Sequence, residues 1–148
     1  MSRFKSTILC IDTDLAELAN QSLVLEAQRY EVLTATNERD ALKLFLAYFV
    51  DAAIVGHTKN IDTERMCGLM KQAKPHIPIM LRSGYGQVSE TALKHVDAFV
   101  DQGRPAEVFL ASLDRMLNLN SRFFSRWLDN WKFRLSSSRL DGKQKEAA

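Results

Sequence analysis

Two cysteines and three histidines are the residues of this sequence that could bind a metal or act as nucleophiles. Cys10 lies in a short apolar run and Cys67 in a helical pattern, so both are predicted to be small buried side chains. The histidines, His57, His76 and His95, are scattered along the chain. They do not combine with the cysteines in the spacing of a zinc site. We therefore expect neither a metal site built from these residues nor a catalytic cysteine.

Polar residues also follow four short apolar runs, where a ligand or a reacting group could be held. They are Asp12, Thr13 and Asp14, then Gly56 and His57, then Arg82 and Ser83, and finally Asp101 and Gln102. The first group contains no glycine, which argues against a dinucleotide-binding loop or a P-loop. No nucleophile with a neighbouring general base can be recognised, so we do not expect an enzyme.

The apolar runs and the stretches between them predict alternating strands and helices. Runs rich in Ile and Val predict five strands, over residues 7–11, 31–35, 51–55, 77–81 and 97–100. Apolar residues spaced by three or four predict buried helix faces at Leu15, Leu18, Ser22 and Leu25, at Ala41, Leu44 and Phe45, and at Met66, Leu69, Met70 and Ala73. A short fourth helix near 89–95 and a fifth after Pro105 complete the series, and Asn37 and Asp62 are predicted helix N-caps.

Five βα units in about 117 residues predict an α/β fold, with a doubly wound five-stranded parallel sheet and helices on both faces. A closed barrel would need eight such units and about 250 residues. In open sheets of this kind, ligands bind at the carboxyl ends of the strands. The four groups of polar residues are therefore expected to lie at one edge of the sheet.

Composition supports one soluble domain with a different C-terminal segment. The chain has 148 residues, of which 46% are hydrophobic and 26% charged. Its longest apolar stretches are far shorter than the roughly 18 residues of a membrane-spanning helix, and residues 1–12 do not form an export signal. We therefore expect a cytoplasmic protein.

Charge is distributed unevenly along the chain. Residues 1–117 carry 13 Lys and Arg against 15 Asp and Glu, a net charge of −2, whereas residues 118–148 carry seven against three, a net charge of +4. We divide the chain into a domain over 1–117, an aromatic and basic helical extension over 118–135, and a flexible polar tail over 136–148. The candidate interaction residues of the extension are Phe123, Phe124, Trp127, Leu128 and Trp131.

The extension could bury its apolar stripe against its own domain or against a second copy, which would make the protein a homodimer. An amphipathic segment on an anionic membrane surface is a weaker alternative. Nucleic-acid binding is not expected, because no recognisable DNA-binding module is present and a net charge of +4 is a weak attraction for nucleic acid.

Four segments of the sequence resemble the receiver domain of two-component response regulators, which has a flavodoxin-like (βα)5 fold. They are residues 7–14 (TILCIDTD), 30–36 (YEVLTAT), 77–86 (IPIMLRSGYG) and 96–100 (VDAFV), and the resemblance extends from Thr7 to Leu117. It implies bacterial phosphorelay signalling, in which an aspartate at the end of strand three accepts a phosphoryl group from a histidine kinase. It also implies an acid pair that binds Mg²⁺ with this aspartate, a hydroxyl and a lysine that contact the phosphoryl oxygens, and an aromatic residue on strand five that turns inward.

Only part of the family's site is kept in this sequence. Asp12 matches the first acid, Ser83 the hydroxyl and Phe99 the aromatic residue. Thr13 stands at the position of the second acid, Gly56 at the phosphoacceptor and Gln102 at the lysine. Read without the family, Asp12 caps the next helix or accepts backbone N–H bonds. In the same reading, Phe99 packs in the core and His57 fills space beside Gly56.

These departures predict a degenerate receiver, a pseudo-receiver that works by protein contacts without phosphorylation. Glycine has no nucleophile, and Asp51 lies five residues back, about 16 Å away along a strand. With Asp12 alone, Mg²⁺ has too few oxygen ligands, so Asp12 would be a vestigial ligand and no cofactor is expected. The expected partner is a signalling protein or a histidine kinase, bound by the face of the last two βα units. The alternative is a working receiver whose acceptor is His57 or Asp14.

Overall fold

The structure, a computed structural model, describes residues 6–84 and 88–119. In this part of the chain, five parallel strands form one sheet in the order β2-β1-β3-β4-β5. The strands are β1 Thr7–Ile11, β2 Glu31–Ala35, β3 Ala52–Gly56, β4 Ile79–Ser83 and β5 Ala98–Asp101. The helices are α1 Leu15–Ala27, α2 Glu38–Ala47, α3 Thr63–Ala73 and α4 Glu90–Leu93, followed by a helix over residues 106–119.

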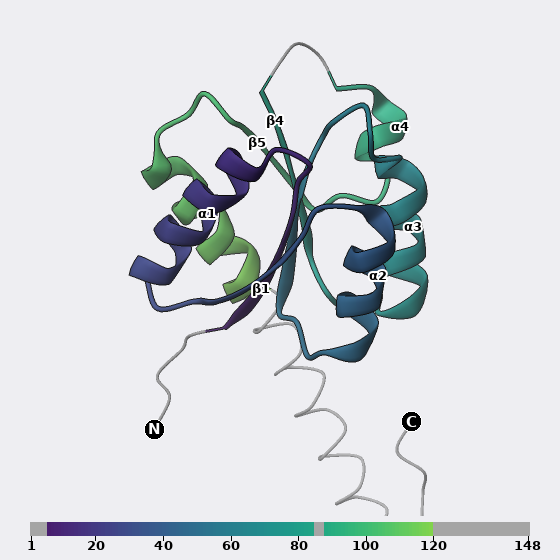
Figure 1. Cartoon of the computed structure of the whole chain (residues 1–148), viewed down its shortest axis with the longest axis horizontal. Helices are drawn as coiled ribbons and strands as arrows, with labels where there is room; N and C mark the ends of the chain where they lie inside the picture. Colours follow the sequence, from purple (N-terminus) through teal and green to yellow (C-terminus); the bar gives the residue numbers. More distant parts are fainter. Residues whose placement is uncertain (1–5, 85–87, 120–148) are drawn as a thin grey trace, which may run out of the picture. The chain divides into compact units, whose positions relative to one another are not determined.

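The helices cover both faces of the sheet. Figure 1 shows α1 and the 106–119 helix on one face and α2, α3 and α4 on the other. The side chains between sheet and helices divide accordingly into two buried clusters, one including Phe45, Met66 and Met70, the other including Leu25, Phe109 and Leu113. The predicted α/β fold with a doubly wound five-stranded parallel sheet is confirmed.

The limits of β3 and β4 differ from the prediction, at Pro78 and at the polar ends of the two strands. The first two strands begin and end as predicted, but β4 begins at Ile79 instead of residue 77. Pro78 has no N–H to donate inside a central strand, and only its carbonyl is used, as acceptor for the Ala53 N–H at 3.0 Å. At the other end, Arg82 and Ser83 continue β4, and Gly56 is the last residue of β3.

The helix faces are confirmed in part. Leu18, Leu25, Ala41, Phe45, Met66 and Met70 are buried as predicted. Leu15 is 68% exposed, Leu69 is 39% exposed and Ala73 is also exposed, so the prediction that these three residues face the core is wrong. Gln21 is buried one position before Ser22. The N-caps at Asn37 and Asp62 are confirmed, because each side chain accepts a backbone N–H from the first turn that follows.

Residues Met1–Leu117 form one compact unit. Of the predicted extension over 118–135 only Asn118 and Leu119 are described, so the five candidate interaction residues between Phe123 and Trp131 lie outside the described residues, as does the tail over 136–148. Within the described segments, no helix is long and apolar enough to cross a membrane.

Candidate functional site

Three neighbouring strands place Asp12, Gly56 and Arg82 at the carboxyl edge of the sheet. Asp12 directly follows β1, whose last residue Ile11 is in register with Val55 of β3. Gly56, one residue further, is in register with Arg82 of β4. The central residue of this row therefore has no side chain, with an acid on one side and a base on the other.

Asp12 is held in the interior at this edge. Only 2% of its surface is exposed, and its Oδ1 accepts the Asp14 N–H at 2.9 Å. Its Oδ2 is buried and has no hydrogen-bond partner among the described residues. Burial raises the pKa of the Asp12 carboxyl above its usual value, and the hydrogen bond from the Asp14 N–H opposes this shift.

The space beside Gly56 is filled by the Asp12 side chain. A Cβ placed on Gly56 would lie 2.6 Å from Cγ of Asp12, closer than two carbon atoms can approach without a shift. The position that the resemblance assigns to the phosphoacceptor therefore lacks a nucleophile, and a side chain at this position would have to displace the Asp12 carboxyl.

Asp14 and His57, the two alternative phosphoacceptors, both have partners in the local structure. Asp14 is the N-cap of α1, and its Oδ1 accepts the N–H groups of Ala16 at 3.0 Å and Glu17 at 3.2 Å. The helix cap is thus Asp14, whereas Asp12 accepts a backbone N–H from the turn before the helix, the second of the two roles expected for it. His57 is half-buried, and its Nδ1 lies 3.1 Å from the hydroxyl of Thr63, the first residue of α3.

Arg82 is a buried residue of this edge that is not among the site positions implied by the family resemblance. It is 6% exposed, and its Nη1 donates to Oε2 of Glu17 on α1 at 3.2 Å. Its guanidinium carbon lies 4.4 Å from the centre of the Phe109 ring on the 106–119 helix, a cation–π distance. Its Nε is buried without a partner among the described residues. In the sequence, Arg82 directly follows the apolar run over 77–81, which indicates a strand end but not that the side chain is buried.

Arg82 and Asp12 also influence each other electrostatically. Burial lowers the pKa of the Arg82 guanidinium, while Glu17, Cys10 and Asp12 oppose this shift. In return, the positive charge of Arg82 works against the upward shift of the Asp12 pKa. The described edge thus contains a fixed internal cation next to a single buried carboxylate.

Ser83 is the last residue of β4, and Gln102 directly follows β5. Ser83 is buried, and its carbonyl accepts the Gln102 N–H at 2.9 Å. The side-chain oxygen of Gln102 lies against Gly84, only 2.5 Å from where a Cβ of that residue would be. Thr13 is half-buried. The structure thus brings Asp12, Thr13, Gly56, Ser83 and Gln102 to one edge, as predicted.

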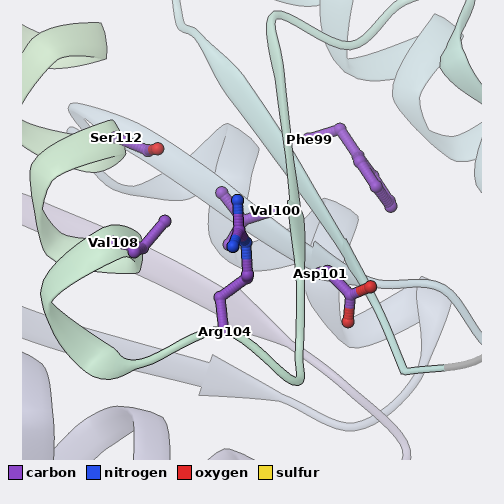
Figure 2. Close-up of a pocket in the computed structure, with 6 residues that line it drawn as sticks. All are labelled: Phe99, Val100, Asp101, Arg104, Val108 and Ser112. Atoms are coloured by element: carbon purple, nitrogen blue, oxygen red, sulfur yellow. The ribbon is translucent and has the colours of Figure 1, made fainter.

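Phe99 does not pack in the core. It is 44% exposed on β5, which is an edge strand of the sheet, so the expectation of core packing is wrong. It belongs to the lining of a pocket of about 370 Å³ between β5 and the 106–119 helix, with Val100, Asp101, Arg104, Val108 and Ser112. Figure 2 shows Phe99 and Asp101 on one side of β5, with Arg104, Val108 and Ser112 on the other.

The acidic side chains described at this edge do not form a binding site for a divalent cation. In the described ranges, no group of three or more His, Cys, Asp or Glu residues is placed to hold a metal ion. Asp12 is the single carboxylate of the edge row, and Asp14 caps α1. Mg²⁺ is usually held by one or two carboxylates, with waters completing its octahedral shell, and here the second nearby acid, Asp14, is already used as the cap of α1.

The cysteines are buried and unreactive at neutral pH. Burial raises the pKa of the Cys10 thiol to about 12 and that of Cys67 to about 12. Both thiols are free and buried, as predicted. Thiols with such pKa values are not nucleophiles at neutral pH, because the thiolate is the reactive form.

The fold of this chain is similar to the solved structures of several receiver domains. A response regulator receiver domain protein (CheY-like) from Methanospirillum hungatei is 20% identical with a TM-score of 0.74, and the match covers 79% of this chain and 97% of that one. The signal receiver domain of an HD domain-containing protein from Pseudomonas fluorescens is 18% identical with a TM-score of 0.76, covering 85% and 96%. A response regulator from Thermotoga maritima in complex with Mg²⁺–BeF is 21% identical with a TM-score of 0.70, covering 75% and 98%.

Neither protein-family models nor curated protein sequences give a match to this sequence. The likeness to receiver domains therefore concerns the fold.

Proposed function

We propose that this chain, which has the fold of response-regulator receiver domains, is a receiver-like adaptor of two-component signalling that does not accept a phosphoryl group. The observation that carries the proposal is the pair Gly56 and Asp12. The phosphoacceptor position has no side chain, and the Asp12 carboxylate lies where that side chain would begin. Phosphoryl transfer depends on a positioned nucleophile and on charge neutralisation, and this edge supplies neither a nucleophile nor a set of metal ligands.

The adaptor acts in this proposal as a protein-binding module and not as an enzyme. The face formed by the last two βα units, where Phe99 is exposed beside the pocket, is the expected contact for a signalling protein or a histidine kinase. The extension over 118–135 is expected to mediate self-association into a homodimer. Cytoplasmic location follows from the same proposal, since the partners of receiver domains act inside the cell.

Intact-mass measurement after incubation with acetyl phosphate and Mg²⁺ tests the absence of phosphorylation. We expect no adduct of about 80 Da, the mass of one phosphoryl group. A receiver domain with a complete acid set, treated in the same buffer, should gain the adduct and shows that the donor is active. An adduct on the present chain that is lost in Asp12→Ala would refute the proposal.

The alternative acceptors give separate outcomes in the same measurement. An adduct that is lost in His57→Ala, or in Asp14→Asn, would identify a working receiver with a non-standard acceptor. The structural partners of these residues support the adaptor, because the His57 ring lies against the Thr63 hydroxyl and the Asp14 side chain caps α1.

A further inference from the structure

Helix α2 ends in three large apolar side chains that the rest of the described chain leaves uncovered. Leu46 is 59% exposed, Tyr48 54% and Phe49 97%. All three lie within four residues, between the last turn of α2 and the start of β3. A scattered exposed leucine is ordinary in a soluble protein, but three large neighbours are a patch that calls for a partner.

The patch is held by specific contacts on both sides of Phe49. The Nζ of Lys74 donates to the carbonyls of Phe45 at 2.8 Å and Tyr48 at 3.1 Å. After Phe49, the side chain of Val50 is buried, and the Asp51 N–H donates to the Thr7 carbonyl at 2.8 Å. The exposure of Phe49 is therefore built into an anchored connection.

Two cations continue this patch along the exposed face of α2. Arg39, Lys43 and Leu46 follow one another at spacings of four and three residues, which places them on one side of the helix. Arg39 and Lys43 are exposed, and neither has an ion-pair partner among the described residues. The neighbouring acids are engaged, since Glu38 pairs with Arg65 and Asp40 accepts from the Asn37 side chain at 3.1 Å.

We propose that the α2 surface, formed by Arg39, Lys43, Leu46, Tyr48 and Phe49, docks an acidic amphipathic helix of a partner protein. The inference rests on the proposed adaptor role and names a surface and a partner class for it. The two free cations would pair with carboxylates of the partner, and the apolar end would receive its hydrophobic face. The surface runs about 15 Å along the helix axis, which corresponds to about three turns of a partner helix.

The charges at the end of the sheet favour a protein helix over a lipid surface. Glu31 and Asp51 are exposed, and both bind Thr7 at the amino edge of the sheet. Phe49 precedes Asp51 by two residues, so it lies near the same edge. A flat anionic bilayer touching Phe49 would face these carboxylates and be repelled by them. A helix lying along α2 meets that edge only with the apolar side chains that contact Phe49, and its carboxylates lie further along α2, against Arg39 and Lys43.

Binding of two synthetic peptides to the full chain, followed by fluorescence anisotropy, tests the proposal. One is an amphipathic helix of about 18 residues with Leu on one face and Glu on the other, and the second carries Lys in place of Glu. We expect the Glu peptide to bind and the Lys peptide not to bind. Phe49→Ser should weaken binding about tenfold or more, because the most exposed aromatic anchor of the surface is lost. Arg39→Glu combined with Lys43→Glu should reverse the preference and select the Lys peptide.

A matched variant on the opposite face of the sheet is the control. Leu23 of α1 is 66% exposed, and Leu23→Ser should leave peptide binding unchanged. Equal binding of both peptides, binding of neither, or unchanged binding by Phe49→Ser would overturn the proposal. Binding to vesicles of phosphatidylserine and phosphatidylcholine that Phe49→Ser abolishes would replace it with a lipid surface, and a dimer in light scattering that the same change dissociates would replace it with a second copy.

This test and the test of the adaptor role fail separately. A phosphoryl adduct together with selective binding of the Glu peptide would refute the phosphorylation-independent role and leave the α2 surface in place. Absence of the adduct together with absence of peptide binding would refute only the α2 surface.

Discussion

Asp12 is the residue on which the chemistry of the carboxyl edge depends. Its carboxylate is buried, bound on one oxygen by the Asp14 N–H, and placed against the backbone of Gly56. The location of Asp12, Gly56 and Gln102 at this edge could be predicted from the sequence, because each of them follows a predicted strand. That Asp12 takes up the space beside Gly56 could not, because the direction of a short side chain depends on neighbours from two strands and a turn.

The contact between Asp12 and position 56 can be measured with a double-mutant cycle. Gly56→Ala should reduce the free energy of unfolding by about 1–3 kcal/mol, since the new methyl group collides with the Asp12 carboxyl. In the background of Asp12→Ala the same change should have an effect below about 0.5 kcal/mol. Urea denaturation of the four proteins gives both values.

Gly103→Ala is the matched control for this cycle, because its Cβ would lie 3.3 Å from Asp101 Oδ1 in an exposed turn. It should change stability little in either background. Equal losses from Gly56→Ala with and without the Asp12 carboxyl would contradict the packing described here.

The raised pKa of Asp12 predicts a pH dependence of stability with a definite sign. A carboxyl whose pKa is higher in the folded protein than in the unfolded chain binds its proton more tightly when folded. Its contribution to stability is full below the unfolded pKa, near 3.9, and is lost as the pH rises through the folded value. The free energy of unfolding of the wild type minus that of Asp12→Asn should therefore increase from pH 7 to pH 4, by at most about 1.4 kcal/mol per pH unit. A difference that decreases over this range would show that Asp12 is stabilised as the anion.

At the scale of elements, Arg82 joins three of them. Its side chain extends from β4 and contacts two helices. It donates a hydrogen bond to Glu17 of α1 and lies over the Phe109 ring of the 106–119 helix. The alternation of strands and helices was predictable from the apolar periods, since each period is local. The limits of β4 and the burial of Arg82 depend on Pro78 and on partners up to 65 residues away in the sequence, so the local pattern could not contain them.

Removing the partner of a buried cation should be more harmful than removing the cation itself. Glu17→Gln leaves the Arg82 charge buried without its carboxylate and should cost about 1–3 kcal/mol of unfolding free energy. Arg82→Met fills a similar volume without a charge and should cost less. Adding Glu17→Gln to Arg82→Met should then cost little more, and urea denaturation of the three variants measures these differences.

The ion pair between Arg65 and Glu38 is the comparison on the surface. Arg65 is 61% exposed at its side chain, so Arg65→Ala should change stability by less than about 1 kcal/mol. A loss from Glu17→Gln no larger than this would mean that Arg82 does not need its partner.

For the whole molecule, the fold arises from a strand and helix repeat that the sequence displays clearly, while its surfaces do not follow from that repeat. Leu15 and Phe49 are apolar and would be assigned to the core by type alone, yet they are 68% and 97% exposed. Exposure of such residues depends on which helix face meets the sheet and on how a connection is anchored. The distribution of charge is different, because it can be counted along the chain: residues 1–117 carry −2 and residues 118–148 carry +4.

Removal of the basic segment is the change expected to alter the behaviour of the whole molecule. If the aromatic and basic stretch over 118–135 joins two copies, the full chain should be a dimer in light scattering, and a chain ending at Leu117 should be a monomer. The shortened chain retains the buried residues Phe109, Leu113 and Met116 and should unfold cooperatively, which shows that dissociation is not loss of folding. Trp127→Ser with Trp131→Ser in the full chain should also dissociate the dimer, since these two aromatic side chains provide much of the apolar area available for burial. A dimer that persists in the shortened chain would place self-association within residues 1–117, and a monomeric full chain that binds anionic vesicles would assign the segment to a membrane surface.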